Sequence, residues 1–288
     1  MNNDESDPKL IKPFITEFIE SLSEQESSVR VVLFKSILEI AKSSPDIIPI
    51  QSISNFLSDP DSFIRETSTK ILGIIGYKNP MVVTDNLINR ALADEDWIVR
   101  EAAVSSLGAI IEHQEDKTRI IEKLTTLLDD EQGWVRRSAL IILSKIEEVD
   151  EDYLPFKKLL NCLTNEDPKV REAAVGLLKI YSNNIEEIFD NIVELLGDHE
   201  KEVRTSIINS IVALIQKVGL NPILSKLLKN LSDTGSIEIQ RSISLILGRT
   251  AKYENEKIKK RVISVLKIRC EMSQDPIICG TLQQLRES

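Results

Sequence analysis

Six arginines recur along the chain, each directly after an aliphatic residue, at steps of 35, 35, 36, 35 and 33 residues. A guanidinium group binds a carboxylate or a phosphate through two parallel hydrogen bonds, so such a series can form structural ion pairs or a phosphate-binding track. An acidic residue stands four positions before most of these arginines, which favours ion pairs between repeats. We therefore predict a structural ladder that includes Asp61, Arg65, Asp96, Arg100, Arg136, Asp167, Arg171, Glu200 and Arg204, with Arg30 as the first arginine of the series.

Other residues with catalytic or metal-binding chemistry are sparse. The chain has only two histidines, and the single His199-Glu200 step cannot supply a di-iron centre of the kind that several His-Glu pairs build. The sequence contains no Gly-x-Ser-x-Gly, phosphate loop, dinucleotide fingerprint or HExxH motif. Its acidic clusters fall at predicted turns and do not match a calcium loop. We predict no catalytic residue, no cofactor and no metal.

The arginine period also indicates the architecture. Two degenerate copies of the aliphatic–arginine step follow, at Ile239-Gln240 and Ile278-Cys279. A period in this range is typical of stacked helical units. Counting from the aliphatic anchor as position zero, positions 0, +4, +8 and +11 share one helix face. These positions are apolar in the units Val99, Ala103, Leu107, Ile110; Val135, Ala139, Leu143, Ile146; and Val170, Ala174, Leu178, Tyr181.

Capping residues predict where each anchored helix begins. The residue three positions before the anchor is acidic in Glu26, Asp61, Asp96, Asp167, Glu200 and Asp275, and an aspartate there can accept from unpaired backbone N–H groups. Another amphipathic segment precedes each such helix. We predict an all-α fold, an α-solenoid (alpha-alpha superhelix) of about eight antiparallel helix pairs. Its units span about 8–43, 47–76, 81–112, 116–148, 152–182, 185–217, 220–252 and 255–288, as one solenoid after a disordered acidic segment at 1–7.

The repeat grammar resembles that of a known family. The order of leucines, an aspartate turn and Val-Arg-x-Ala-Ala-x-x-x-Leu-Gly is similar to the HEAT repeat, in particular the short HEAT-like repeats of the phycobilisome-lyase type. The run from Asp167 to Ala174 is the clearest unit, and the resemblance covers about residues 8–288. It implies that the second helix of each pair lines a concave face. It also implies a ladder of aspartate and arginine between neighbouring repeats.

Positions +2 and +6 lie farthest from the apolar stripe, so we expect them to face the concave groove. As partner-binding residues we name Glu66, Lys70, Glu101, Ser105, Arg137, Ile141, Glu172, Thr205, Asn209, Arg241 and Leu245. Ile141 and Leu245 can anchor a partner peptide or helix. Trp97 and Trp134 stand at the starts of second helices. Tryptophan is common at binding hot spots, but at a helix entry we expect it to pack under the turn.

Charge is unevenly distributed. Residues 1–215 hold 23 Lys/Arg against 39 Asp/Glu, a net −16, whereas residues 216–288 hold 13 against 7, a net +6. The basic cluster is Lys257, Lys259, Lys260, Arg261, Lys267 and Arg269. It can be a solvated end cap or a contact for nucleic-acid phosphates or an acidic partner. HEAT-like DNA glycosylases carry a strongly basic concave face, which the mixed groove positions here do not match.

The remaining features limit the setting. No apolar run reaches the roughly 18 residues that cross a bilayer, and the polar start is unlike a secretory signal. The three cysteines form no CxxC pair, so we expect reduced thiols that serve as small core residues in the cytoplasm. We predict a non-enzymatic scaffold or adaptor that binds another protein on its concave face. The alternative is a nucleic-acid-associated protein that uses its basic end, and a less favoured one is a lyase-like or repair-like enzyme.

Overall fold

The computed structural model describes residues 8–76, 80–113, 117–146, 149 and 152–287. Within these residues the regular elements are sixteen α-helices and short 3-10 turns, with no strand. This confirms the predicted all-α solenoid of about eight helix pairs. The predicted disordered segment 1–7 lies outside the described residues. The chain divides into two compact units, Met1–Lys145 and Ile146–Ser288, and the prediction of one continuous solenoid stays a prediction.

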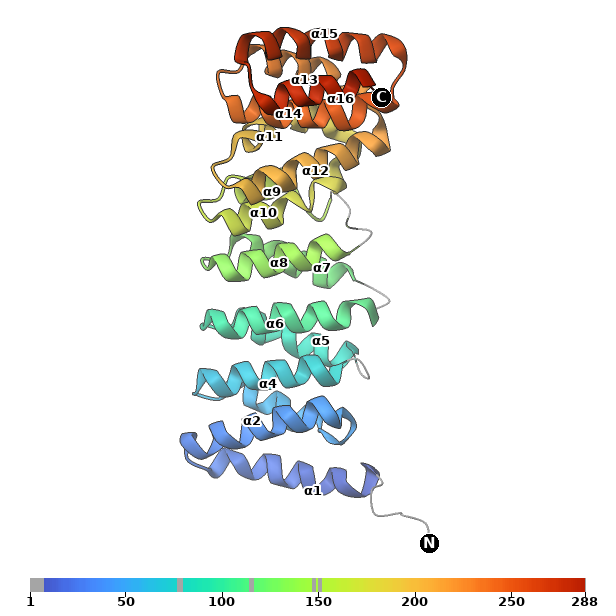
Figure 1. Ribbon diagram of the computed structural model, residues 1–288. Helices are drawn as coiled ribbons and strands as arrows, with labels where there is room; N and C mark the ends of the chain where they lie inside the picture. Colours follow the sequence, from blue (N-terminus) through green and yellow to red (C-terminus); the bar gives the residue numbers. More distant parts are fainter. Residues whose placement is uncertain (1–7, 77–79, 114–116, 147–148, 150–151, 288) are drawn as a thin grey trace. The chain divides into compact units, whose positions relative to one another are not determined.

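Unit 1 contains four helix pairs, whose second helices follow one another in a layer (Figure 1). Helix α2 packs against α4, α4 against α6, and α6 against α8. The pairs are α1 (Pro8–Ser21) with α2 (Ser27–Ser43), α3 (Ile50–Asn55) with α4 (Ser62–Ile75), α5 (Pro80–Asn89) with α6 (Trp97–Ile110), and α7 (Thr118–Thr126) with α8 (Gly133–Lys145).

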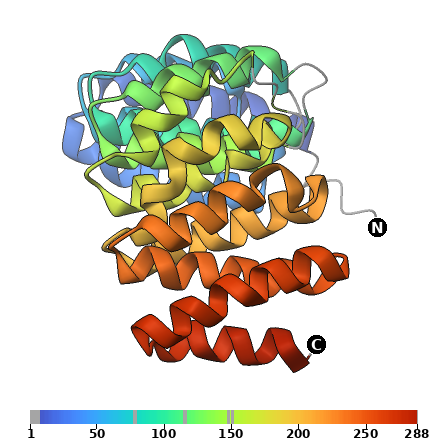
Figure 2. The same cartoon turned by 90° about the horizontal axis from the view of Figure 1, so that it is seen from above.

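Unit 2 contains the other four pairs. The red pair α15–α16 lies beside the orange α14 (Figure 2), and α14 packs against α16. The pairs are α9 (Phe156–Leu163) with α10 (Pro168–Val175), α11 (Ile185–Ile192) with α12 (Lys201–Val218), α13 (Asn221–Asp233) with α14 (Ile237–Thr250), and α15 (Glu256–Ser273) with α16 (Pro276–Glu287).

The core of each unit is built from the predicted apolar stripe. In α6 the side chains of Val99, Ala103, Leu107 and Ile110 are fully buried. The corresponding stripes that start at Val135 and Val170 are buried as well. Burial of these positions in successive pairs gives the neighbour-on-neighbour core that defines a repeat array.

The predicted N-cap hydrogen bonds form where the residue three before the anchor is aspartate. Asp61 and Asp96 each accept a hydrogen bond from the backbone N–H two residues later, both at 3.0 Å, and Asp167 does the same at 2.8 Å. Glu26 and Glu200 occupy the same position but make no side-chain cap bond. Glutamate has one more methylene group, and it is not among the residues that N-caps prefer.

The cysteines correct the sequence prediction. Cys162 is buried and forms no disulfide, as expected, but Cys270 and Cys279 are linked to each other by one. Cys270 lies in the last turn of α15 and Cys279 in the first turn of α16, so the hairpin between the helices brings their Cα atoms to 4.9 Å. Because disulfides are rare in reducing compartments, two of the three cysteines no longer support the cytoplasmic prediction.

Candidate functional site

The arginine series forms ion pairs between successive helix pairs. Arg65 donates from Nε and Nη2 to the two carboxylate oxygens of Asp94, at 2.7 and 2.9 Å. Its Nη1 donates to the carbonyl oxygens of Asp59 and Pro60. These two residues belong to the loop that joins the two helices of the same pair, which we call the corner loop. Arg100 with Asp130 and Arg171 with Asp198 repeat this geometry. Each of these arginines therefore links the corner loop of its own helix pair to the corner loop of the next pair.

The predicted acidic partners of the ladder were wrong by two residues. Asp61, Asp96, Asp167 and Glu200 were expected to pair with the arginines, but the pairing carboxylates belong to Asp59, Asp94, Asp130 and Asp198. Asp61, Asp96 and Asp167 instead cap their helices, whereas Asp275, three before the last anchor, both caps its helix and pairs with an arginine. The pairing aspartate, five before the anchor, follows the 3-10 turn of the first helix and also accepts the backbone N–H two residues later, as Asp94 does from Asp96 at 2.9 Å.

Two further ladder arginines show the corner bonds. Arg136 donates from Nη1 to the carbonyl oxygens of Asp130 and Glu131 at 2.6 and 3.0 Å. Arg204 donates likewise to the carbonyls of Asp198 and His199. Both side chains therefore hydrogen-bond to their own corner loops.

Arg241 was predicted to face the groove but belongs to the ladder. Its Nε and Nη2 donate to Asp275 Oδ2 at 2.9 and 2.8 Å. The one-residue shift has a local cause, because Gln240 takes the usual arginine position. Gln240 Nε2 makes the corner bond, to the carbonyl oxygen of Thr234 at 2.8 Å. Arg241, the next residue, supplies the positive charge that pairs with Asp275 of the following helix pair.

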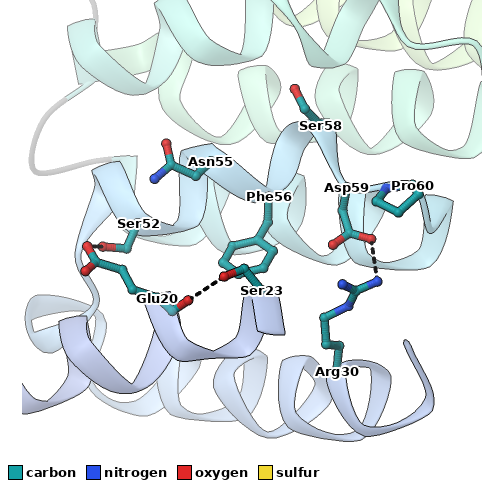
Figure 3. A pocket seen from close by; sticks show the side chains of 9 residues that line it. All are labelled: Glu20, Ser23, Arg30, Ser52, Asn55, Phe56, Ser58, Asp59 and Pro60. Carbon is teal, nitrogen blue, oxygen red and sulfur yellow. Dashed lines mark hydrogen bonds and ion pairs between the residues drawn. The ribbon is translucent and has the colours of Figure 1, made fainter. Parts of the chain in front are cut away.

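The first step of the ladder is looser and borders a cavity of about 420 Å³ (Figure 3). Arg30 reaches Asp59 through a single contact, Nη2 to Oδ1 at 3.2 Å, and its Nε is buried without a hydrogen-bond partner. On the opposite wall Ser52 donates to Glu20 at 3.1 Å. The lining residues are Glu20, Ser23, Arg30, Ser52, Asn55, Phe56, Ser58, Asp59 and Pro60.

The predicted partner-binding residues, apart from Arg241, lie on the exposed side of the second helices. None of them is buried. Unit 1 brings together Glu66 and Lys70 on α4, Glu101 and Ser105 on α6, and Arg137 and Ile141 on α8. Unit 2 places Glu172 on α10, Thr205 and Asn209 on α12, and Leu245 on α14.

Several of these side chains are held in place by neighbours. Ser105 and Ser138 both donate to Glu101 Oε1, at 2.9 and 3.0 Å, and the second bond joins α8 to α6. Lys70 pairs with Glu66 at 2.6 Å. The exposed side of the second helices in unit 1 is therefore an ordered surface of alternating charge.

One row on this side was missed by the sequence analysis. Phe63, Ile98 and Trp134 each stand one residue before the anchor of α4, α6 and α8. A helix places positions −1, +2 and +6 on one side, because they are three and four residues apart. Ile98 is 39% and Trp134 59% exposed, and Phe63 is half-buried. We call Phe63, Ile98, Trp134, Glu101, Arg137 and Ile141 the unit 1 helix face.

The two tryptophans differ by one position in the repeat. Trp97 stands two residues before its anchor and is half-buried, whereas Trp134 stands one residue before its anchor and is exposed. That single step rotates the side chain by about 100° around the helix. The expectation that Trp134 packs under the turn was therefore wrong. Its indole ring instead lies 5.7 Å from the guanidinium carbon of Arg137.

The basic cluster lies on α15. Lys257, Lys260, Arg261 and Lys267 are exposed, whereas Lys259 and Arg269 are half-buried. The four exposed residues fall within about one third of the helix circumference at 100° per residue. Ile268 and Met272, 55% and 69% exposed, share this side. The exposed side of α15 is therefore both basic and apolar.

Metal-binding clusters and membrane-spanning helices are both absent from the described part of the chain. Its His, Cys, Asp and Glu side chains include no group of three or more that could hold a metal ion. No helix there combines the length and apolar character needed to cross a bilayer.

Comparisons with known proteins agree with this architecture. The HEAT repeats family matches residues 84–156. An X-ray structure of the Escherichia coli protein YibA is similar over 100% of both chains, with 22% identity and a TM-score of 0.57. The complex of CpcE and CpcF of phycocyanin lyase from Nostoc sp. is 17% identical, covering 83% of this chain and 94% of that one with a TM-score of 0.47. No curated protein matches the sequence. Residues 84–156 of this chain are therefore HEAT repeats, carried on an all-α solenoid fold.

Proposed function

We propose that the chain is a non-catalytic scaffold or adaptor that binds another protein on the unit 1 helix face. The observation that carries the proposal is the exposed Trp134, with Arg137 against its ring and Ile141 on the same side of α8. Tryptophan and arginine are the residues most enriched at interface hot spots. An exposed tryptophan at this position has a large apolar area to bury on binding.

The neighbouring helices extend this surface. Ile98 on α6 and Phe63 on α4 add apolar contact at the same repeat position. Glu101 and Arg137 supply charges of opposite sign beside them. An elongated partner segment, such as an amphipathic helix, would meet one apolar anchor and one charged group from each second helix that it crosses.

Quantitative affinity capture tests this function. Immobilised wild-type protein, Trp134→Ala and Ile141→Glu are exposed to the same native lysate, with Met81→Glu as the control. Met81 is 76% exposed on α5, outside the unit 1 helix face. We expect a protein that wild type and control retain and both face variants lose. It must then bind the purified wild type directly, with an affinity at least tenfold above that of Trp134→Ala. Equal retention by all four baits would contradict the proposal.

The alternative is binding of nucleic-acid phosphates by the exposed basic residues of α15. Lys257, Lys260 and Arg261 favour it, since phosphate contacts need clustered cations. The same side also holds Glu256 and Glu271, which would repel a phosphate, and the apolar Ile268 and Met272, which a phosphate would leave exposed to water. Retention of a labelled duplex that falls steeply with salt, and is lost in Lys260→Glu/Arg261→Glu, would favour this alternative.

A further inference from the structure

The first helix pair exposes residues that other pairs bury. In α6, Ser106 donates to the carbonyl oxygen of Thr69 in α4 at 3.2 Å, so positions +3, +7 and +11 face the preceding pair. These positions are buried in α4 and α6, as Thr67, Ile71, Ile75, Ala102, Ser106 and Ile110. The residues of α2 at the anchor, +3 and +11 are Val29, Val32 and Ile40. They remain aliphatic, yet they are 36–62% exposed.

Helix α1 extends the same surface. Leu10, Phe14 and Phe18 recur every four residues and are 43–73% exposed. Glu20 of α1 accepts a hydrogen bond from Ser52 of α3, so its side of the helix faces the second pair. Phe18, two residues earlier, points about 200° away around the helix. Phe14 and Phe18 therefore face away from the second pair, as Val29 and Val32 do, and Leu10 lies at the edge of this row.

Within the described residues, these six apolar side chains of the first helix pair are exposed. We call Leu10, Phe14, Phe18, Val29, Val32 and Ile40 the end face. An exposed apolar patch bounded by polar residues is typical of an interaction site.

Charge indicates what covers the end face. Glu17, Glu24 and Glu26 lie beside it, all exposed, and no ion pair to them occurs within the described residues. An occupant that combines apolar and basic side chains would suit it. The exposed side of α15 has this composition. Ile268 and Met272 lie next to Lys257, Lys260, Arg261 and Lys267, and these four cations outnumber Glu256 and Glu271 on the same side.

We propose that the end face binds helix α15 of a second copy of this chain. The interface is heterologous, because the two surfaces differ, so each copy keeps one free end face or one free α15 after pairing. Copies therefore assemble in series as concentration rises. Two end faces pressed together would instead bring the carboxylates of Glu17, Glu24 and Glu26 close to one another, which costs energy through like-charge repulsion. This proposal uses surfaces separate from the unit 1 helix face.

Sedimentation velocity over a hundredfold concentration range tests the assembly with purified protein alone. We expect the mass-averaged sedimentation coefficient to rise with concentration and to fall at 1 M salt, where charges are screened within about 3 Å. Phe14→Glu and Lys260→Glu/Arg261→Glu should each stay monomeric. Met81→Glu and Lys229→Glu, exposed changes outside both surfaces, should assemble like wild type. Circular dichroism confirms that each variant is folded.

Mixing the two monomeric variants distinguishes a heterologous from a self-complementary interface. Phe14→Glu keeps an intact α15 and the double variant keeps an intact end face, so an equal mixture should give a one-to-one dimer and nothing larger. Three results would overturn the proposal: a wild type that is monomeric throughout, a double α15 variant that still dimerises, or a mixture that stays monomeric. Binding of a labelled duplex by a monomeric wild type would assign α15 to nucleic acid instead.

Discussion

Arg100 of α6 binds Asp130, in the loop that precedes α8, through two parallel hydrogen bonds. Nε donates to Oδ2 at 2.8 Å and Nη2 to Oδ1 at 2.9 Å. The side chains are only 9% and 6% exposed. A charge pair this buried is costly to break, because removal of one partner leaves the other desolvated and uncompensated. The bond thus ties the register of one helix pair to that of the next.

We predict that Arg100→Ala lowers stability by about 3–5 kcal/mol. Arg100→Lys should recover only part of this, since an ammonium group cannot make the two parallel bonds. Arg30→Ala is the matched comparison. Its single 3.2 Å contact with Asp59 and its unpartnered Nε predict a smaller loss. Thermal and urea unfolding measure all three, and an equal loss for Arg30→Ala and Arg100→Ala would contradict the ladder geometry.

The pairing aspartate Asp198 predicts a dependence of stability on pH. Burial raises the pKa of Asp198, but the hydrogen bonds from Arg171 and from the Glu200 backbone outweigh it and leave the pKa below its ordinary value. The folded state therefore binds this proton less readily than the unfolded state. Its stabilisation is full above the unfolded pKa of about 4 and is lost as pH falls through the lower, folded value.

Acid unfolding of wild type and Asp198→Asn checks this expectation. Stability of the wild type should fall from about pH 5 downward, whereas the variant, which has no proton to bind at this position, should start lower and lose less over the same range. Asp190→Asn is the control, since its carboxylate is exposed and its pair with Lys226 lies on the surface. Parallel curves for wild type and Asp198→Asn would refute the link.

The sequence predicted the parts of the fold that follow a strict period. Anchors such as Val99 and Val135 and caps such as Asp96 occur where spacing requires them. The ladder partner was misassigned because Asp94 and Asp96 stand two residues apart in one acidic corner. Only the turn geometry decides that the first binds the guanidinium and the second caps the helix.

The proposed binding surfaces were harder to predict, because they depend on how far each side chain is rotated around its helix and on which helices pack against it. Trp97 and Trp134 look equivalent at helix starts, yet a one-residue offset buries one in part and exposes the other. Val29 and Val32 follow the core pattern, yet they are exposed within the described residues. Cys270 and Cys279 meet because a hairpin folds between them, which cysteine spacing alone does not reveal.

Close packing between second helices gives a third prediction. A Cβ added to Gly73 would lie 2.6 Å from Ser106 Cβ and 3.0 Å from its Cα, so α4 and α6 would have to separate. We expect Gly73→Ala to destabilise by about 1–3 kcal/mol, as overpacking does. Gly280→Ala in α16 meets nothing within 4 Å and should be neutral or stabilising, because alanine favours a helix. A urea midpoint that falls equally for both variants would argue against close contact at Gly73.

The disulfide between α15 and α16 gives the last prediction. It closes a short loop, with a sequence separation of 9. It should therefore stabilise the final hairpin by about 2–3 kcal/mol, because it lowers the conformational entropy of the unfolded chain. Non-reducing peptide mapping should find Cys270 linked to Cys279 and Cys162 unlinked. Cys270→Ser and Cys279→Ser should each lower the unfolding midpoint. The double variant should lose no more than either single one, since both remove the same bond. Additive losses, or a wild-type midpoint that dithiothreitol leaves unchanged, would show that the two cysteines act as separate thiols.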